Sequence, residues 1–248
     1  MIPLKSPKEI ETMRENGRVL AKIMRVLKET SEPGITTLKL EELARRLIQK
    51  AGAEPSFLGF EGYPAVLCAS VNEEIVHVPP SNRVLKEGDI LSLDLGLFKD
   101  GFHVDMAITF PIGQVSFEAK RLIEVTKKAL RLAIKKARVG NTFGDIGNTI
   151  ERFVRAQGFE VIRDLCGHGI GKKLHEEPKV LNFGKRRKGP EIKEGMVFCI
   201  EPMVSQGSFE IVKTKDGFGW KTKDNSLSCH FEHTIAILKG EAIILTKE

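Results

Sequence analysis

Blocks of helical and strand-like pattern follow one another in a repeating order along this chain of 248 residues. Apolar residues recur at helical spacing after Ser6 and again after Thr37, and strand-like segments follow at 65–71, 90–98 and 103–110. The order then repeats, with helical patterns at 117–138 and 143–157 and strand-like segments at 161, 196–204, 229–238 and 242–245. This order predicts an α+β fold, with residues 1–248 as one domain made of two similar halves, 1–112 and 113–248.

Cap and turn residues mark where several of these segments begin and end. Ser6 followed by Pro7 is typical of a helix N-cap and first helical position. Pro33 and Gly34 predict that this helix has ended before them. Asp100-Gly101 lies between two strand-like segments and predicts a tight hairpin turn.

The composition is that of an ordinary folded protein. The chain is 41% hydrophobic and 29% charged, which is typical of soluble globular domains. Its apolar runs have only strand length, so we expect no membrane-spanning segment. The first ten residues show neither an apolar core nor a small-residue cleavage site, so we expect no secretory signal and a cytoplasmic location. No long apolar stripe is evident, and we therefore expect a monomer.

Cysteine spacing and net charge limit the kinds of metal site, disulfide framework and binding partner that this protein can have. No two cysteines form a C-x-x-C pair, which argues against a zinc ribbon, and a chain of this size without a leader argues against a disulfide framework. We expect buried free thiols at Cys68, Cys166, Cys199 and Cys229. The formal charge of +6 indicates either an anionic partner, such as nucleic acid or the ribosome, or a solvated basic face.

The most informative residues are acids inside apolar strand-like segments. Asp94 lies in Ile-Leu-Ser-Leu-Asp-Leu-Gly, and Asp105 follows across the predicted hairpin. A tight hairpin can bring the two carboxylates together, where they would repel each other unless a cation compensates. Taken alone, an acid in a strand is more often a hydrogen-bonded structural residue than a metal ligand.

A histidine and two further acids have similar surroundings. His168 is flanked by glycines in Gly-His-Gly-Ile-Gly, a segment that could also be a simple turn, and Glu201 and Glu232 lie in or beside apolar segments. Four carboxylates with one imidazole suit Mn²⁺, Fe²⁺, Co²⁺ or Zn²⁺ better than a thiolate site would. Four carboxylates can neutralise two divalent cations, which can activate a shared water. Spacing alone leaves both a metal site and separate structural acids open.

Several motifs in a fixed order resemble methionine aminopeptidases of type I, which have the pita-bread fold. The resemblance spans nearly the whole chain. It rests on Lys5–Arg14, Gly62-Tyr63-Pro64, Val71-Asn72-Glu73, His77, Asp94, residues 99–105, residues 167–171, His175-Glu176-Glu177-Pro178, residues 201–204, residues 221–224 and Glu232-His233-Thr234. The fold implied is two pseudo-symmetric halves with antiparallel sheet covered by helices.

The resemblance implies removal of the initiator methionine from nascent chains, with a preference for a small second residue. It implies two divalent cations held by Asp94, Asp105, His168, Glu201 and Glu232. Glu201 would also relay a proton from the attacking water. His175 would donate to the substrate carbonyl, and His77 would contact the scissile nitrogen.

The resemblance also places the walls of a methionine pocket at Phe57, Phe60, Tyr63, Cys68 and Phe218. Aromatic edges suit a thioether side chain, although aromatic residues in such positions could equally belong to the core. Several residues near the site depart from those usual in the family: Phe60, Val78, Met106, Leu174 and Phe218. These departures make the pocket the least predictable part of the site.

Two other functions of the same fold stay open. The first is a proline-specific peptidase, although such relatives usually carry an extra N-terminal domain for which this length leaves no room. The second is a non-catalytic binding protein, in which we would expect lost ligands. As a partner surface, the basic stretches 185–188 and 213–215 could approach ribosomal RNA or could simply be solvated.

Overall fold

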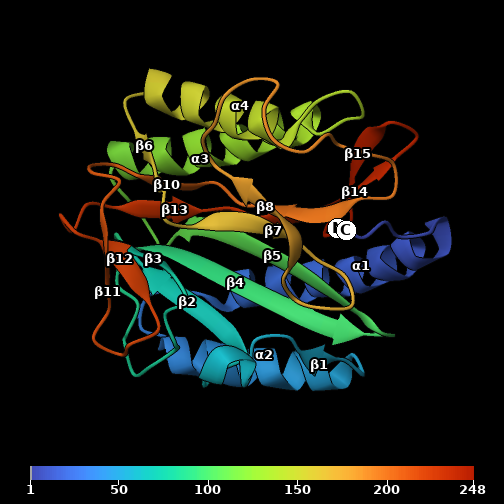
Figure 1. Cartoon of the computed structure of the whole chain (residues 1–248). Coiled ribbons are helices and arrows are strands. Elements are labelled where there is room, and N and C mark those ends of the chain that lie inside the picture. The colour runs from blue at the N-terminus through green and yellow to red at the C-terminus, as the bar shows by residue number, and fades with distance from the viewer. Residues whose placement is uncertain (1) are drawn as a thin grey trace.

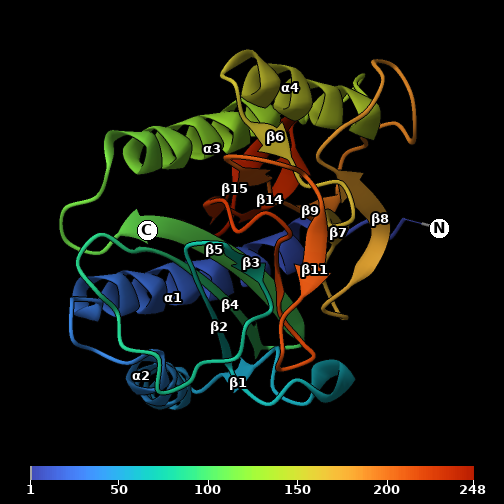
Figure 2. The ribbon, with the colours of Figure 1, turned by 90° about the vertical axis from the view of Figure 1, so that its left-hand side faces the viewer.

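The computed structural model of this protein describes residues 2–248. Helices α3 and α4 lie together at the top of Figure 1, α2 lies at the bottom, and the strands lie between them. The view in Figure 2 shows the same arrangement, with α1 crossing the middle of the molecule. The helices are α1 (Pro7–Thr30), α2 (Thr37–Lys50), α3 (Phe117–Lys136) and α4 (Phe143–Ala156), with a short 3₁₀ helix η1 at Phe60–Gly62.

The start and end of α1 confirm the predictions made from its caps. The Ser6 side chain accepts a hydrogen bond from the backbone of Glu9, and the Glu9 side chain accepts one from the backbone of Ser6. This reciprocal capping box satisfies two amide groups that the first turn leaves without helical partners. The helix ends at Thr30, ahead of Pro33, as expected.

A long hairpin forms the centre of the first sheet. Strands β4 (Ile90–Lys99) and β5 (Phe102–Pro111) pair along their full lengths, and Asp100 and Gly101 adopt the positive φ angles, 50° and 84°, of a tight turn. Strand β4 pairs on its other edge with β1 (Glu54–Pro55) and β2 (Leu67–Val71). The predicted hairpin is confirmed.

The second large sheet has five strands, in the spatial order β15, β14, β9, β7, β8. Smaller three-stranded sheets join β13, β10 and β6, and β11, β12 and β3. The bounds of these strands are β3 Glu74–Val76, β6 Glu160–Val161, β7 Cys166–Gly169, β8 Glu176–Leu181, β9 Val197–Ile200, β10 Met203–Ser205, β11 Ile211–Lys213, β12 Trp220–Thr222, β13 Ser228–His230, β14 His233–Leu238 and β15 Glu241–Ile244.

Two strands expected to be continuous are each broken, and this corrects the sequence prediction. The segment 196–204 divides into β9 and β10 at Glu201 and Pro202, and the segment 229–238 divides into β13 and β14 at Phe231 and Glu232. Pro202 has no N–H to donate to a sheet ladder. Each break changes the sheet to which the chain belongs, and it occurs at one of the acids expected to bind metal.

Apolar side chains form two main buried clusters. One consists mostly of residues from 10–112, and the other mostly of residues from 119–237. Three of the expected thiols are buried, but Cys166 is only half-buried. Within residues 2–248, no helix is both long and apolar enough to cross a membrane.

Candidate metal centre

Asp94 and Asp105 come together on the central hairpin, as predicted. In the register of β4 and β5, Gly96 lies opposite Asp105, so the two acids are diagonal neighbours. Both are buried, with 7% and 3% of their surface exposed. Thr234 holds the backbone of Asp105 from both sides, because its hydroxyl accepts from the amide at 2.9 Å and donates to the carbonyl at 2.8 Å.

The strand breaks turn Glu201 and Glu232 toward the same point. The amide of Glu232 donates to the carbonyl of Ala107 on β5 at 2.9 Å, which ties the break between β13 and β14 to the central hairpin. The carbonyl of Glu201 accepts from the side chain of Asn182 at 2.9 Å. Carboxylate oxygens of Asp94, Asp105 and Glu232 all lie within 4.8 Å of one another.

His168 enters the cluster from β7 because its neighbours have no side chains. A Cβ at Gly167 would lie 2.4 Å from the carbonyl of Cys199, and a Cβ at Gly169 would lie 2.1 Å from that of Glu177. Nδ1 of His168 lies 2.9 Å from the carbonyl of Gly169, and a proton there leaves Nε2 with a lone pair. These two glycines therefore allow β8 and β9 to approach β7 closely.

The carboxylates carry an electrostatic cost that a cation would offset. Burial, together with repulsion from neighbouring carboxylates, raises the pKa values of Asp94, Glu201 and Glu232 well above their ordinary range. Burial also raises the pKa of Asp105 to about 7. Divalent cations favour the ionised forms and remove this penalty.

Buried carboxylate oxygens without hydrogen-bond partners show that these residues fit a bound metal. In the part of the chain that the structure describes, one buried oxygen each of Asp94, Asp105 and Glu232 has no hydrogen-bond partner. Nε2 of His168 lies 3.8 Å from a Glu201 oxygen and 4.0 Å from a Glu232 oxygen. Oxygens without donors, beside an imidazole lone pair, form the donor set of a divalent cation site.

The cluster forms part of the lining of a cavity of about 870 Å³, within the size range of small-molecule sites. All the residues predicted for the site line this cavity: Phe57, Phe60, Tyr63, Cys68, His77, Asp94, Asp105, His168, His175, Glu201, Phe218 and Glu232. Leu174 also lines it, whereas Val78 and Met106 do not. Of the departures from the family pattern, Phe60, Leu174 and Phe218 therefore touch the cavity space.

His175 approaches the cluster from the start of β8. Its ring lies 4.3 Å from the ring of His168 and 4.9 Å from that of Phe60, measured between centroids. Burial lowers the pKa values of His168 and His175, the former to about 3. Both rings are therefore neutral near pH 7.

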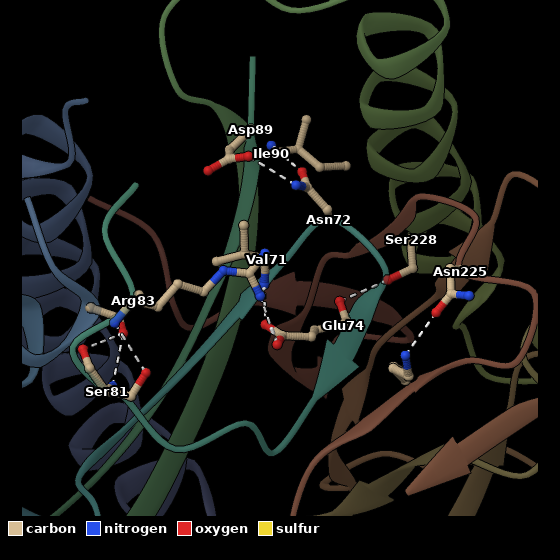
Figure 3. Close-up of polar contacts among 11 residues, drawn as sticks. Val71, Asn72, Glu74, Ser81, Arg83, Asp89, Ile90, Asn225 and Ser228 are labelled. Carbon is tan, nitrogen blue, oxygen red and sulfur yellow. Dashed lines mark hydrogen bonds and ion pairs between the residues drawn. The ribbon is translucent and has the colours of Figure 1, made fainter. Parts of the chain in front are cut away.

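His77 reaches the cavity in a strained backbone conformation, with a φ of 59°. Positive φ is costly for a residue with a side chain and persists only where surrounding contacts hold it. Figure 3 shows such contacts just before His77: Asn72 donates to Asp89 at 2.8 Å, and the carbonyl of Glu74 accepts from Ser228 at 2.8 Å. The first bond ties the turn between β2 and β3 to the residue just before β4, and the second ties β3 to β13.

The aromatic residues form one wall of the cavity. The rings of Tyr63 and Phe218 meet edge to face at 5.8 Å, and the Tyr63 hydroxyl donates to the carbonyl of Leu67 at 3.0 Å. The hydroxyl is thus satisfied by backbone. Trp220 does not line the cavity, and the Lys213 ammonium lies 4.4 Å from its ring centroid.

The sequence matches metallopeptidase family M24 over residues 11–239. Methionine aminopeptidase of Clostridium perfringens (strain 13 / Type A) is 47% identical over 246 residues, covering 99% of each chain. The chain belongs to metallopeptidase family M24. Methionine aminopeptidase of Escherichia coli (strain K12) is 40% identical and covers 99% of this chain and 94% of its own. These matches confirm the family expected from the motifs.

Solved structures of the M24 family agree with this assignment. Methionine aminopeptidase of Thermotoga maritima superposes with a TM-score of 0.98 at 41% identity, covering all of both chains. The prolidase of Pyrococcus horikoshii OT3 has a TM-score of 0.77 at 22% identity, and this chain covers 63% of it. The second likeness shows the shared pita-bread fold alone.

One residue of this M24 site was missed in the sequence. His230 is 1% exposed, and its Nε2 lies 3.5 Å from Oε2 of Glu201. Burial lowers the pKa of His230 to about 3. The available signal was its position two residues before Glu232, since alternate residues of an extended segment share a face.

Proposed function

We propose that this chain is a metal-dependent aminopeptidase that removes an N-terminal methionine from peptides and nascent chains. One observation carries the proposal: a single cavity joins a buried carboxylate and imidazole cluster to an aromatic wall. The cluster suits peptide hydrolysis and the wall suits a thioether side chain. Relatives named methionine aminopeptidase, at 40–47% identity over nearly the full chain, support the same function.

Two divalent cations, of Co, Mn, Fe or Zn, would be held by Asp94, Asp105, His168, Glu201 and Glu232. The positions of the ligand atoms support this assignment. Glu232 lies close enough to Asp94 and Asp105 to share one cation with them, and close enough to Glu201 to share a second. Lewis-acid activation of the scissile carbonyl and of the attacking water is the chemistry that such cations supply.

The chain's own residues would carry out the proton transfers. Glu201 would accept a proton as the water oxygen adds to the carbonyl carbon, and would pass that proton to the amine nitrogen when the tetrahedral adduct collapses and its C–N bond breaks. His175 donates a hydrogen bond to the carbonyl oxygen, and His77 contacts the scissile nitrogen. Both histidines lie in the cavity wall, as these roles require.

The aromatic wall would select the methionine side chain. Phe57, Phe60, Tyr63, Cys68 and Phe218 all line the cavity. Sulfur packs favourably against the edges of aromatic rings. A closed end of this pocket would restrict removal to chains with a small second residue.

A peptide panel tests the proposal. We expect release of methionine from Met-Ala-Ser peptides, with a lower kcat/KM when the second residue is Leu or Phe, measured by chromatography under Mn²⁺, Co²⁺, Fe²⁺ and Zn²⁺ separately. Cleavage only beside proline would instead assign a proline-specific peptidase. An absence of turnover and of metal binding would assign a non-catalytic binding protein.

The wider setting forms part of the proposal. We propose that residues 1–248 form one catalytic domain with related halves at 1–112 and 113–248, which the division of the buried core into two clusters supports. We also propose that the protein acts as a monomer in the cytoplasm, where nascent chains with an N-terminal methionine emerge.

Contact with the ribosome is proposed through the basic segment 185–188, which lies in an exposed loop, and through residues 213–215. We expect reversal of the charges at Lys185, Arg186, Arg187 and Lys188 to reduce co-sedimentation with ribosomes, most strongly at low salt, because phosphate contacts release counterions. Unchanged sedimentation in the variant would contradict the contact. Unchanged peptide hydrolysis serves as the control for folding.

A further inference from the structure

We propose that His230 is a positioning residue for Glu201, with its Nε2–H donating a hydrogen bond to Oε2 of that carboxylate. The other oxygen, Oε1, would then stay directed toward His168. This inference rests on the proposed function, in which Glu201 relays a proton. It assigns a role to an imidazole outside the five proposed metal ligands.

The backbone holds His230 firmly at the end of β13. Its amide donates to the Thr109 hydroxyl at 2.9 Å, and its carbonyl accepts from the same hydroxyl at 2.7 Å. The Thr109 hydroxyl also lies 2.7 Å from that of Ser92 on the neighbouring strand β4. With the backbone bound on both sides, the direction of the ring is restricted to its side-chain torsions.

The ring has hydrogen-bonding groups that nothing else uses. Among the residues that the structure describes, neither Nδ1 nor Nε2 of His230 has a hydrogen-bond partner, although both are buried. Burying a polar group without a partner is costly. Oε2 of Glu201 lies 3.5 Å from Nε2, about 0.5 Å beyond an ordinary hydrogen bond. A small rotation about the broad χ2 torsion of histidine can close this gap.

Glu201 lies between two imidazoles, one for each of its oxygens. Oε1 is 3.8 Å from Nε2 of His168, and Oε2 is 3.5 Å from Nε2 of His230. Asn182 donates its hydrogen bond to the backbone carbonyl of Glu201 and not to the carboxylate. The orientation of the carboxylate plane therefore depends on the groups near its two oxygens. A donor at Oε2 would keep Oε1 available to a cation and to a proton.

The cavity lining favours a positioning role over direct metal binding. Atoms of His230, Glu201 and Glu232 lie within 4.8 Å of one another, so a ligand role has to be considered. The five proposed ligands all line the cavity, and His230 is absent from its lining. His230 therefore lies behind Glu201, where partners that orient metal ligands are usually found.

The test compares His230→Leu, which removes the donor, with His230→Gln, whose amide can donate from a similar distance. The control is His233→Gln, because His233 follows Glu232 and its Nδ1 lies 2.9 Å from the Thr246 hydroxyl, away from the site. Mn²⁺ affinity is measured by calorimetry, and bound imidazoles are counted by pulsed EPR of the Cu²⁺-loaded protein.

We expect His230→Leu to lower Mn²⁺ affinity and kcat, each by about 10- to 100-fold, with little change in KM. We expect His230→Gln to retain most of both, and the EPR spectrum to show one imidazole in every variant. Two imidazoles in the parent and one in both His230 variants would make His230 a ligand and overturn the proposal. Equal losses in the Leu and Gln variants, or Mn²⁺ affinity unchanged in both, would also overturn it.

The readouts separate this inference from the proposed function. Calorimetry and EPR use no peptide, so they test the link between His230 and the metal centre directly. If the unaltered protein fails to release methionine from Met-Ala-Ser while the metal readouts behave as expected, the proposed function fails and the positioning of Glu201 stands.

Discussion

Substitution of Glu201 by glutamine is expected to lower kcat for Met-Ala-Ser peptides by about 10²- to 10⁴-fold, the usual contribution of a general base. Glutamine has the same shape and keeps one oxygen toward His168, but its amide accepts no proton from water. KM is expected to change little, because the lost interaction acts in the transition state. Steady-state kinetics with saturating Mn²⁺ measure both constants.

The matched control for Glu201→Gln is Glu151→Gln. Glu151 is a partly exposed acid that pairs with Arg163 at 2.6 Å, outside the cavity. This variant tests whether replacing a glutamate by glutamine lowers turnover simply by destabilising the fold. We expect full activity for this control, and a thermal unfolding curve for Glu201→Gln close to that of the parent. A kcat for Glu201→Gln within threefold of the parent would reject the proton-relay role.

The metal-free protein is expected to lose stability as the pH rises from 7 to 8.5. Burial raises the pKa of Asp105 to about 7 and those of Asp94, Glu201 and Glu232 well above their usual range. Asp105 releases its proton early in this window, so the decline comes from Asp94, Glu201 and Glu232 as long as they hold protons that the unfolded state has already released. Each such proton contributes about 1.4 kcal/mol per pH unit, or a fall of roughly 3–6 °C in Tm.

The window is chosen so that histidines do not contribute. Burial lowers the pKa values of His77, His168 and His230, and these groups stabilise the fold as the pH rises toward 6.5, so their effect is complete by pH 7. Saturating Mn²⁺ should remove most of the decline, because it binds the ionised carboxylates. The measurement is Tm by calorimetry in EDTA or Mn²⁺. If the Tm in EDTA stays level or rises between pH 7 and 8.5, the raised pKa values of the carboxylates are wrong.

Local signals predicted the helices and the central hairpin well. Ser6 forms the expected N-cap, and Asp100-Gly101 forms the expected turn, because both depend on residues that are close in the chain. The short strands β7, β8, β11 and β12 were not predicted. They have three to six residues each, too few for a periodic pattern. In addition, β7 and β12 each pair with a strand distant in the chain, β9 and β3 respectively.

The residue types in the candidate site could be selected from sequence, but their arrangement could not. Asp94 and Asp105 were expected to converge because a hairpin joins them. Glu201 and Glu232 were expected inside strands, and the structure places both at strand breaks. Nothing in the sequence alone indicated that Thr234 holds the backbone of Asp105, or that Ala107 binds the amide of Glu232.

The sequence alone therefore determined the α+β class, the two-helix blocks and the chemistry available to a metal, because these depend on local pattern and residue type. The tertiary structure decided which atoms meet. Close approach of β7 to β8 and β9 requires glycines at 167 and 169, and it directs His168 toward Glu201. It also brought His230 behind that carboxylate. Such contacts join segments that are distant in the chain, and only folding of the whole domain brings them together.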